Sequence, residues 1–454
     1  MNSTRHTATM VNADCVDYMH NMAASSIDSI VCDPPYGLKF MGKGWDSMDH
    51  GNAQQAWHAR WLREAFRVLK PGGLIVAFGG SRTYHRLVCA AEDVGFEIRD
   101  SLHWMYGSGF PKSLNVGKAI DRAAGAEREV IGPNPAAIGR KSNKTGGRLI
   151  GGHIQDRANV DVLTAPATPE AKQWEGWGTA LKPAHEPVLL ARKPLIGTVA
   201  ANVLLHGTGA INVDACRVGT TDQLSCSTAA PCTDADGATG GTWNPTSTPG
   251  MVRNQHKGGR WPANILLTHS AACVVTGART LRGDNRAGQS KGTRPGGFGD
   301  VGADSGSPKP SGALYGDAVG HVYDCAPDCP VAALDGQPGA TGGASRFYPS
   351  LSWDSVYDAP FLYNAKAAKK EREQGRPADF DGKRWNTHPT VKPVAVMRWL
   401  TKLVTPPGGV VLDPFMGSGT AGIAAIDLGV AYIGIEVDPD YYALALARVE
   451  HVFP

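Results

Sequence analysis

The sequence predicts an α/β protein with an open, mainly parallel sheet. Both ends of the chain alternate short apolar runs with helix-like segments, and two of the apolar runs lead directly into a polar or glycine-rich loop. Ligand sites of open α/β sheets lie in such loops, at the carboxyl ends of the strands. At 454 residues the chain exceeds one ordinary core, so a second structural unit is expected.

The first part of the chain supplies one series of alternating elements. The apolar run Ser29–Cys32 predicts a strand. The segments after it predict a helix from about Gln54 to Leu69 that is stopped by Pro71-Gly72-Gly73, a strand at Leu74–Phe78, a helix at Ser81–Asp93 and a strand at Phe96–Tyr106. A further strand is expected later in the chain, at Glu186–Lys193.

Two motifs at opposite ends of the chain follow predicted strands. Asp33-Pro34-Pro35-Tyr36 comes after Ser29–Cys32, and its two prolines fix the backbone and remove N–H donors. Near the C-terminus, the strand Gly409–Leu412 leads into Asp413-Pro414-Phe415-Met416-Gly417-Ser418-Gly419-Thr420 and a helix that ends near Leu428. Glycines in such a turn let the backbone approach a ligand closely. Phosphates are held in the same way, so this motif alone does not identify a cofactor.

Two more segments belong with the glycine-rich motif. The next strand, Ala431–Ile435, ends at Glu436, and an acidic residue at that place can accept hydrogen bonds from both ribose hydroxyls. His388-Pro389-Thr390-Val391-Lys392-Pro393 opens the helix that precedes the strand Gly409–Leu412.

Together these motifs resemble those of S-adenosylmethionine-dependent DNA amino-methyltransferases, which methylate an exocyclic nitrogen of adenine or cytosine. The order of the motifs resembles the circularly permuted β group of that family, of phage and bacterial type. The resemblance implies a Rossmann-like methyltransferase sheet with the catalytic half first, the cofactor half last and a large inserted target-recognition region. It also implies duplex DNA as the partner, S-adenosylmethionine as the cofactor and a target base that is flipped out of the helix.

The chemistry of such a reaction explains the first motif. The amino nitrogen of adenine is a poor nucleophile because its lone pair is delocalised into the ring, so both of its N–H groups must be held by acceptors. The Asp33 carboxylate can accept one N–H and the Pro34 carbonyl the other, on a backbone that Pro35 helps to fix. Tyr36 offers a ring face for the flipped base.

The resemblance also implies the cofactor residues. The glycine-rich loop of the family cradles the methionine part of the cofactor, the acidic residue binds the ribose, and the third motif is a candidate for the methionine carboxylate. Asp14 stands where β-group enzymes place an acidic residue near the cofactor adenine, although it could equally be a solvated turn residue. The predicted cofactor residues are therefore Asp14, Thr390, Lys392, Asp413, Phe415, Gly417, Gly419, Thr420 and Glu436.

The expected organisation is core, insertion, core, insertion, core. The predicted parts are a catalytic half at 1–105, a hairpin-tip insertion near the active site at 106–180, a core strand at 181–197, a target-recognition insertion at 198–384 and a cofactor half at 385–454. The tip insertion suits a loop that closes over a flipped base or a DNA strand, or an ordinary surface loop. The larger insertion is rich in Gly, Ser, Thr and Pro, and such stretches bury little apolar surface.

A structural zinc ion is a candidate for holding the large insertion together. His269 and Cys273 form one local pair and Cys325 and Cys329 another, which would complete a closed tetrahedral site. Ordinary reduced cysteines with an exposed histidine are the alternative. Three further cysteines could substitute as ligands: Cys216, Cys226 and Cys232.

Composition limits the surroundings of the protein. No apolar run is long enough to span a bilayer, the first ten residues have no signal-peptide core, and nine cysteines fit a reducing compartment, so we expect a cytoplasmic protein of a bacterial host, possibly phage-encoded. The net charge of +3 is small, but basic residues gather in one stretch, which predicts phosphate contacts or a solvated loop. They are Arg253, Lys257, Arg260, Arg279, Arg282, Arg286, Lys291 and Arg294, with Asp284 as the opposing charge.

Four functions fit these patterns to different degrees. A site-specific adenine-N6 DNA methyltransferase comes first, because Asp at the first motif position is more typical of adenine enzymes in the resembling family. Cytosine-N4 methylation is the runner-up within that class. RNA or protein-amide methylation and a non-catalytic DNA-binding protein on the same fold follow. The sequence has no P-loop and no recognisable nuclease motif, so a restriction activity would need a separate nuclease partner.

Overall fold

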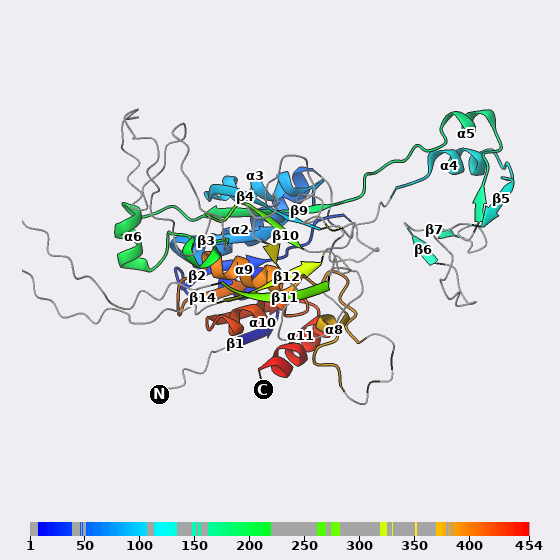
Figure 1. Cartoon of the computed structure of the whole chain (residues 1–454). Helices are drawn as coiled ribbons and strands as arrows, with labels where there is room; N and C mark the ends of the chain where they lie inside the picture. Colours follow the sequence, from blue (N-terminus) through cyan, green and yellow to red (C-terminus); the bar gives the residue numbers. More distant parts are fainter. Residues whose placement is uncertain are drawn as a thin grey trace, which may run out of the picture.

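The chain was analysed as a computed structural model, which describes residues 8–38, 46, 48, 51–106, 113–133, 148–150, 153–155, 162–218, 261–268, 274–281, 318–324, 329, 350–351, 369–377, 380, 382 and 385–453. In these ranges the chain forms a nine-stranded sheet with helices on both faces (Figure 1). The predicted α/β class is confirmed.

The strand order of the sheet defines its topology. From one edge to the other it runs β1 (Ala8–Asn12), β15 (Ala431–Glu436), β14 (Val410–Asp413), β2 (Ile27–Cys32), β3 (Leu69–Phe78), β9 (His185–Arg192), β4 (Glu97–Met105), β10 (Ile265–Thr268) and β13 (Ser350–Leu351). Neighbours are parallel except that β9 is antiparallel to both β3 and β4. The chain leaves β14 towards β15 and leaves β2 towards β3, in opposite directions, so the switch point of the sheet lies between β14 and β2.

Two sets of helices bury the two faces. One face is covered by α1 (Cys15–His20), α2 (Asn52–Val68) and α3 (Tyr84–Val94), and the other by α9 (Val394–Val404), α10 (Thr420–Asp427) and α11 (Pro439–Val452). Side chains alternate along the central strands: Ile30 and Ile75 pack with the first set, and Val31 and Val76 with the second. Strands buried on both faces are continuous apolar runs, which is why the sequence predicted them.

The segment Pro71-Gly72-Gly73 differs from its prediction. Helix α2 ends at Val68 and β3 begins at Leu69, so the three residues lie inside the strand and do not terminate the helix. Ile27 and Ser29 of β2 face Leu69 and Leu74 of β3, so β3 bulges between these positions. The bulge is bound from outside the sheet, because the Pro71 carbonyl accepts hydrogen bonds from the Asn202 amide (2.9 Å) and the Thr208 hydroxyl (2.5 Å).

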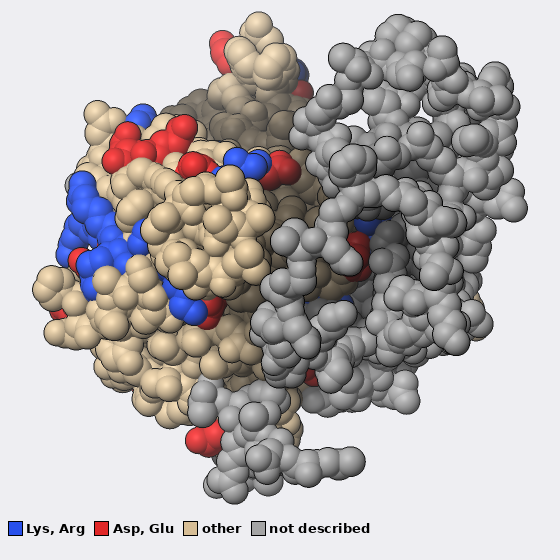
Figure 2. Space-filling model, turned by 90° about the vertical axis from the view of Figure 1, so that its left-hand side faces the viewer, with Lys and Arg blue, Asp and Glu red and all other residues tan. Residues whose placement is uncertain are grey.

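The donors to this bulge come from α6 (Val199–His206) and the turn after it, which precede the 3-10 helix Asp214–Cys216. Helix α6 leaves apolar side chains in solvent, with Leu204 89% and Leu205 72% exposed. Figure 2 views the molecule from the α6 side, where the described surface is largely uncharged and Lys and Arg side chains gather along one edge.

Part of the large insertion joins the main sheet. We expected residues 198–384 to form a unit of their own, but Ile265, Leu266 and Leu267 of β10 pair with the end of β4, and β13 pairs with β10. The insertion therefore extends the core, because its apolar run can complete the ladder at the open edge of β4. Its other described elements are the antiparallel pair β11 (Val274–Leu281) and β12 (Ala318–Asp324), and α8 (Lys369–Arg372).

The residues between β4 and β9 form a small lobe, which we call the tip lobe. It contains α4 (Val116–Ala123), β5 (Val130–Pro133), β6 (Arg148–Ile150), β7 (His153–Gln155), β8 (Val162–Thr164) and α5 (Pro169–Gln173). Strands β5 and β8 pair, as do β6 and β7, and Figure 1 shows α4, α5 and β5 well away from the main sheet. Because β4 and β9 are paired along their length, this lobe lies at the tip of a long hairpin.

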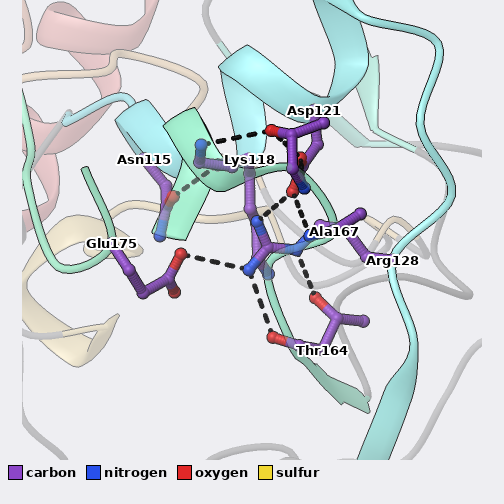
Figure 3. Close-up of polar contacts among 9 residues, drawn as sticks. Asn115, Lys118, Asp121, Arg128, Thr164, Ala167 and Glu175 are labelled. Atoms are coloured by element: carbon purple, nitrogen blue, oxygen red, sulfur yellow. Dashed lines mark hydrogen bonds and ion pairs between the residues drawn. The ribbon is translucent and has the colours of Figure 1, made fainter. Parts of the chain in front are cut away.

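The buried carboxylate of Asp121 organises the tip lobe (Figure 3). It accepts hydrogen bonds from the backbone N–H groups of Ala167 (3.1 Å) and Thr168 (2.9 Å) and forms an ion pair with Arg128 (2.7 Å). Arg128 also contacts Thr164 and, at 3.1 Å, Glu175. Desolvation raises the pKa of Asp121, but these donors outweigh it and lower the pKa to about 2.

We predict that Asp121→Asn destabilises the tip lobe. The neutral Asn side chain cannot form the ion pair with Arg128, and its amide N–H groups would face the donors that now bind the Asp121 carboxylate. Since the folded pKa lies below the ordinary value of 3.8, the contribution of Asp121 to stability is present above that value and lost as the pH falls through about 2. Limited proteolysis should cut the variant faster within residues 113–182. Glu175→Gln, at the solvent side of the same cluster, is the control and should change cleavage less.

Candidate active site

The two predicted motifs leave the same edge of the sheet. Strands β2 and β14 are parallel neighbours with Ile30 opposite Leu412, so the Asp33 loop (residues 33–36) and the glycine loop (residues 413–419) begin side by side. Strands β1 and β15 end at this edge too, with Asn12 opposite Glu436. Groups that lie far apart in the sequence therefore converge at the switch point of the sheet.

The backbone of the Asp33 loop is fixed by side chains from three places. The Tyr36 carbonyl accepts hydrogen bonds from Gln54 of α2 (2.8 Å) and from Thr83, the residue before α3 (2.9 Å). The Gly37 N–H donates to the Asp46 carboxylate (2.7 Å). Gly37 has φ +66°, and a β-carbon there would lie 2.8 Å from the Gln54 side chain, so the turn requires glycine.

The Asp33 carboxylate lies in a network of four polar side chains. Its Oδ2 is 2.5 Å from the Lys392 ammonium and its Oδ1 is 2.8 Å from the Tyr36 hydroxyl. Glu186 completes the network, with its Oε2 2.9 Å from the Tyr36 hydroxyl and 3.3 Å from Lys392 Nζ. Lys392, which we predicted to bind a methionine carboxylate, contacts the two protein carboxylates in this structure.

Burial and charge act against each other in this network. Desolvation raises the pKa of Asp33, Lys392 opposes that rise, and the Glu186 carboxylate adds to it. Desolvation lowers the pKa of Lys392, but Asp33 and Glu186 outweigh it and hold the pKa above its ordinary value. The Lys392 side chain is only 7% exposed, so a charged ammonium is kept in the protein by its two anionic partners.

Sequence reasoning missed Glu186. It stands at the start of a correctly predicted strand, but no spacing linked that strand to Asp33. Because β9 is antiparallel to β3, it begins at the edge where β2 and β3 end, and this brings Glu186 to Asp33. The signal in the sequence was an acidic residue at a strand end, which carries little information without the strand order.

Glu436 holds the glycine loop. Its carboxylate accepts hydrogen bonds from the backbone N–H groups of Gly417 (2.7 Å) and Asp438 (2.9 Å). Gly417 has φ +54°, and a β-carbon there would lie 2.9 Å from the His388 ring. A β-carbon on Gly419 would lie 3.1 Å from Ala445, so this second glycine allows α11 to pack closely. Gly417 thus faces the site, and Gly419 faces the core.

Three other predicted residues of the glycine loop serve its internal structure. Asp413 Oδ1 accepts the Phe415 N–H (3.1 Å), and burial raises the pKa of Asp413 to about 8. The Phe415 ring meets Trp61 of α2 edge to face, with ring centres 5.1 Å apart. Thr420 begins α10, and its hydroxyl lies 3.3 Å from the Arg448 guanidinium.

Arg448 of α11 binds the glycine loop through Ser418. The side chain is fully buried and donates hydrogen bonds to the backbone and hydroxyl oxygens of Ser418 and to the Glu371 carbonyl. Desolvation lowers the pKa of Arg448 to about 10, and the guanidinium still carries its charge at neutral pH. The glycine loop is thereby bound to α11, which covers the same face of the sheet as α9 and α10. No pattern in the sequence indicated a role for Arg448.

Asp14 and Thr390 complete the predicted cofactor set. Asp14 is exposed and caps α1, accepting the Val16 N–H at 2.8 Å, which is the structural role of a turn residue. It nevertheless follows β1 at the same sheet edge as Glu436. Thr390 is half-buried, two residues before Lys392.

The zinc prediction falls mainly outside the described residues. His269, Cys273 and Cys325 lie there, while Cys329 is described and buried. Within the described ranges no group of three or more His, Cys, Asp or Glu residues could hold a metal ion.

Of the basic residues between 253 and 294, only Arg279, in β11, belongs to a described element. In the same ranges no helix is long and apolar enough to cross a membrane.

The sheet order and the site define a class of protein. The sheet is mostly parallel, with the antiparallel strand β9 between β3 and β4, a glycine loop after one central strand and an Asp-Pro-Pro-Tyr loop after its neighbour. These features define a Rossmann-like methyltransferase fold, here with the catalytic half first. The chain belongs to the DNA methylase family of N6/N4 amino-methyltransferases, whose sequence pattern it matches over residues 27–447.

Individual relatives are distant. The chain is 25% identical over 238 residues to the type II methyltransferase M.HindIII of Haemophilus influenzae, a match that covers 44% of this chain and 63% of that protein. It is 26% identical over 231 residues to the type II methyltransferase M2.DpnII of Streptococcus pneumoniae, covering 46% and 81%. The matched region therefore spans less than two thirds of the first relative.

A solved structure is similar in outline only. The cytosine-N4-specific PvuII DNA methyltransferase matches 97% of this chain and 86% of its own, with 12% identity and a TM-score of 0.42. A similarity this low adds nothing to the assignment of the site.

We predict that Asp413→Asn makes the ligand-free protein more stable at high pH. Between the ordinary value of 3.8 and the folded value of about 8, the unfolded chain ionises Asp413 while the folded chain keeps it protonated, so the free energy of unfolding falls as the pH rises through this window. An amide keeps an acceptor for the Phe415 N–H and removes the titration. Thermal unfolding measured across the window should show a flatter pH dependence for the variant than for wild type. The exposed Asp440→Asn is the control, and a slope unchanged by Asp413→Asn would contradict the assignment.

Proposed function

We propose that the protein is a site-specific DNA methyltransferase that transfers a methyl group from S-adenosylmethionine to the exocyclic N6 of adenine in duplex DNA, after the base is flipped out of the helix. One observation carries the proposal: the Asp33 loop and the Gly417–Glu436 contact lie at the carboxyl ends of neighbouring parallel strands. This arrangement supports the proposal, because methyl transfer needs the acceptor for the target amino group beside the cradle for the nucleoside cofactor.

The residues of the Asp33 loop would act on the target amino group. The Asp33 carboxylate accepts one N–H and the Pro34 carbonyl the other, which directs the nitrogen lone pair away from the ring. The backbone that carries these acceptors is fixed before any base enters, since Gln54 and Thr83 bind the Tyr36 carbonyl. The ring of Tyr36 stacks on the flipped base.

The residues present fit the cofactor. Glu436 uses one lone pair of each oxygen for a backbone N–H, so both oxygens can still accept a ribose hydroxyl. Gly417 leaves bare backbone beside His388, whose segment also contains Thr390 and Lys392, and Asp14 follows β1 at the same sheet edge as Glu436. The bound cofactor supplies an electrophilic methyl group on a sulfonium. The chain itself holds the nucleoside and keeps the amino group in line.

Adenine is preferred over cytosine because Asp occupies the first motif position. The product decides between them: nucleoside mass spectrometry of DNA treated with the purified protein should find N6-methyladenine. N4-methylcytosine alone would establish the alternative. Confirmed cofactor binding with no product on varied duplex DNA would favour the non-catalytic reading. Single-molecule sequencing of DNA from an expressing host would give the target sequence.

The two insertions supply the proposed DNA contacts. The tip lobe carries exposed apolar side chains, among them Trp177 (59%) and Leu181 (93%), and it joins the β4–β9 hairpin at the end where Glu186 lies. We assign target recognition to residues 198–384, where the basic stretch 253–294 provides charge for phosphates.

Within that region we keep a zinc site as a proposal that rests on the sequence alone. If His269, Cys273, Cys325 and Cys329 hold zinc, elemental analysis should find close to one metal ion per chain, and Cys325→Ser should impair DNA binding before cofactor binding. Thiolates must be deprotonated to bind, so metal should be released as the pH falls. A fully active, metal-free preparation would exclude the site.

We predict different losses from the two loops. Asp33→Ala should abolish turnover and leave cofactor affinity nearly unchanged, because Asp33 serves the target amino group. Glu436→Ala should weaken cofactor binding by about 1–3 kcal/mol, the free energy of lost hydrogen bonds to a charged group. Calorimetry with the cofactor and methyl-transfer assays separate the two effects, with the exposed Glu450→Ala as control. Equal loss of cofactor affinity in both variants would contradict this division of roles.

A further inference from the structure

Both oxygens of the Asp33 carboxylate are already engaged. Oδ1 is bound by the Tyr36 hydroxyl and Oδ2 by the Lys392 ammonium. Under the proposed function, on which this inference rests, Asp33 must accept an N–H of the target base. The base N–H must compete with these donors for the Asp33 oxygens, and the shorter contact, from Lys392, is the stronger competitor because its donor is charged.

Lys392 cannot simply turn to water. Its side chain is 7% exposed, and a buried ammonium without an anionic partner is strongly unfavourable. The aromatic rings of Phe78 and Tyr36, whose centres lie 4.7 Å and 5.4 Å from Nζ, favour the cation but do not replace a carboxylate. The partner that takes Lys392 must therefore lie within the site.

Glu186 is placed to be that partner. Its Oε2 is 3.3 Å from Lys392 Nζ, and its backbone is held in the β4–β9 ladder opposite Trp104. The other group that faces Glu186 is Tyr106, whose hydroxyl bonds to it and whose pKa is raised by desolvation and by the Glu186 charge. Glu186 thus stays in place while the side chains around it exchange contacts.

The Tyr36 hydroxyl takes part in the same competition. It accepts a hydrogen bond from Lys392 at 3.1 Å and has one proton to donate, yet it faces carboxylate oxygens of both Asp33 and Glu186. It can serve only one carboxylate at a time as donor. When it donates to Glu186, Oδ1 of Asp33 becomes available.

We propose that Glu186 is a positioning residue for base capture: it takes over the Lys392 ammonium and the Tyr36 hydroxyl when Asp33 turns to the target amino group. Without this second carboxylate, Lys392 stays on Asp33 and competes with the base. Glu186 acts through its neighbours and needs no contact with DNA or cofactor.

The test measures base capture separately from turnover. A duplex with 2-aminopurine beside the target adenine reports extrusion of that adenine by fluorescence, and single-turnover methylation of the normal duplex reports the reaction. In Glu186→Gln, extrusion and the single-turnover rate should fall about tenfold or more, as expected for a lost hydrogen bond between charged groups. Total DNA binding and cofactor affinity should stay as in wild type. Glu97→Gln, at the far end of the same strand pair, is the control.

A second variant distinguishes competition from simple damage. Removing the competitor as well, in Glu186→Gln with Lys392→Met, should return extrusion of the target adenine towards the wild-type level, and Glu186→Asp should recover part of it. Extrusion in Glu186→Gln equal to wild type, or no recovery in the double variant, would overturn the inference. A wild-type protein that transfers no methyl group would instead contradict the proposed function, and this inference with it.

Discussion

The parallel pairing of β2 with β14 is the constraint on which the rest of this structure depends. It joins the two ends of the chain, with Ile30 opposite Leu412. Asp28, at the start of this pair, accepts the Val410 N–H at 2.8 Å and forms an ion pair with Lys70 at 2.5 Å, so three central strands are linked at their lower ends. At their carboxyl ends, β2 leads into the Asp33 loop and β14 leads into the glycine loop, so the two loops begin side by side. Any shift in this pairing would separate the proposed acceptor from the proposed cofactor cradle.

Polar side chains are then fixed by groups from outside their own loops. Arg448 reaches the glycine loop from α11, and Gln54 reaches the Asp33 loop from α2. The Arg448 contact is buried and the Gln54 contact is partly buried, so the hydrogen bonds are shielded from water and a missing partner is costly. The four-residue network around Asp33 differs in one respect, because its carboxylates share one ammonium and one hydroxyl proton. Several arrangements of donors can satisfy it, which suits a site that must exchange an internal partner for a substrate.

Both insertions connect to the core through β4, which pairs with β10 on one side and with β9 on the other. Strand β10 completes the open edge of β4, and the antiparallel β9 carries the chain back from the tip lobe into the centre of the sheet. The β4–β9 hairpin therefore connects three things: the tip lobe, the added strands and Glu186. Movement of the tip lobe on DNA would be transmitted along a paired ladder towards the network around Asp33. The internal order of the lobe depends on Asp121, whose donors come from both of its halves.

The sequence by itself determined the fold class, the central strands and the two loops, because buried parallel strands are continuous apolar runs and the loops need residues with special backbone properties. It also predicted Asp33, Gly417 and Glu436 as site residues, and the fold brings their loops to the same edge of the sheet. It could not determine the strand order beyond β4, the bulge at Pro71–Gly73, the support from Arg448 or the contacts of Glu186, because each depends on residues brought together across the chain. Only the tertiary structure decided that Lys392 contacts Asp33 and that Glu186 contacts Tyr36 and Lys392. Glu186 reaches this place because the antiparallel strand β9 begins at the edge where the parallel strands β2 and β3 end.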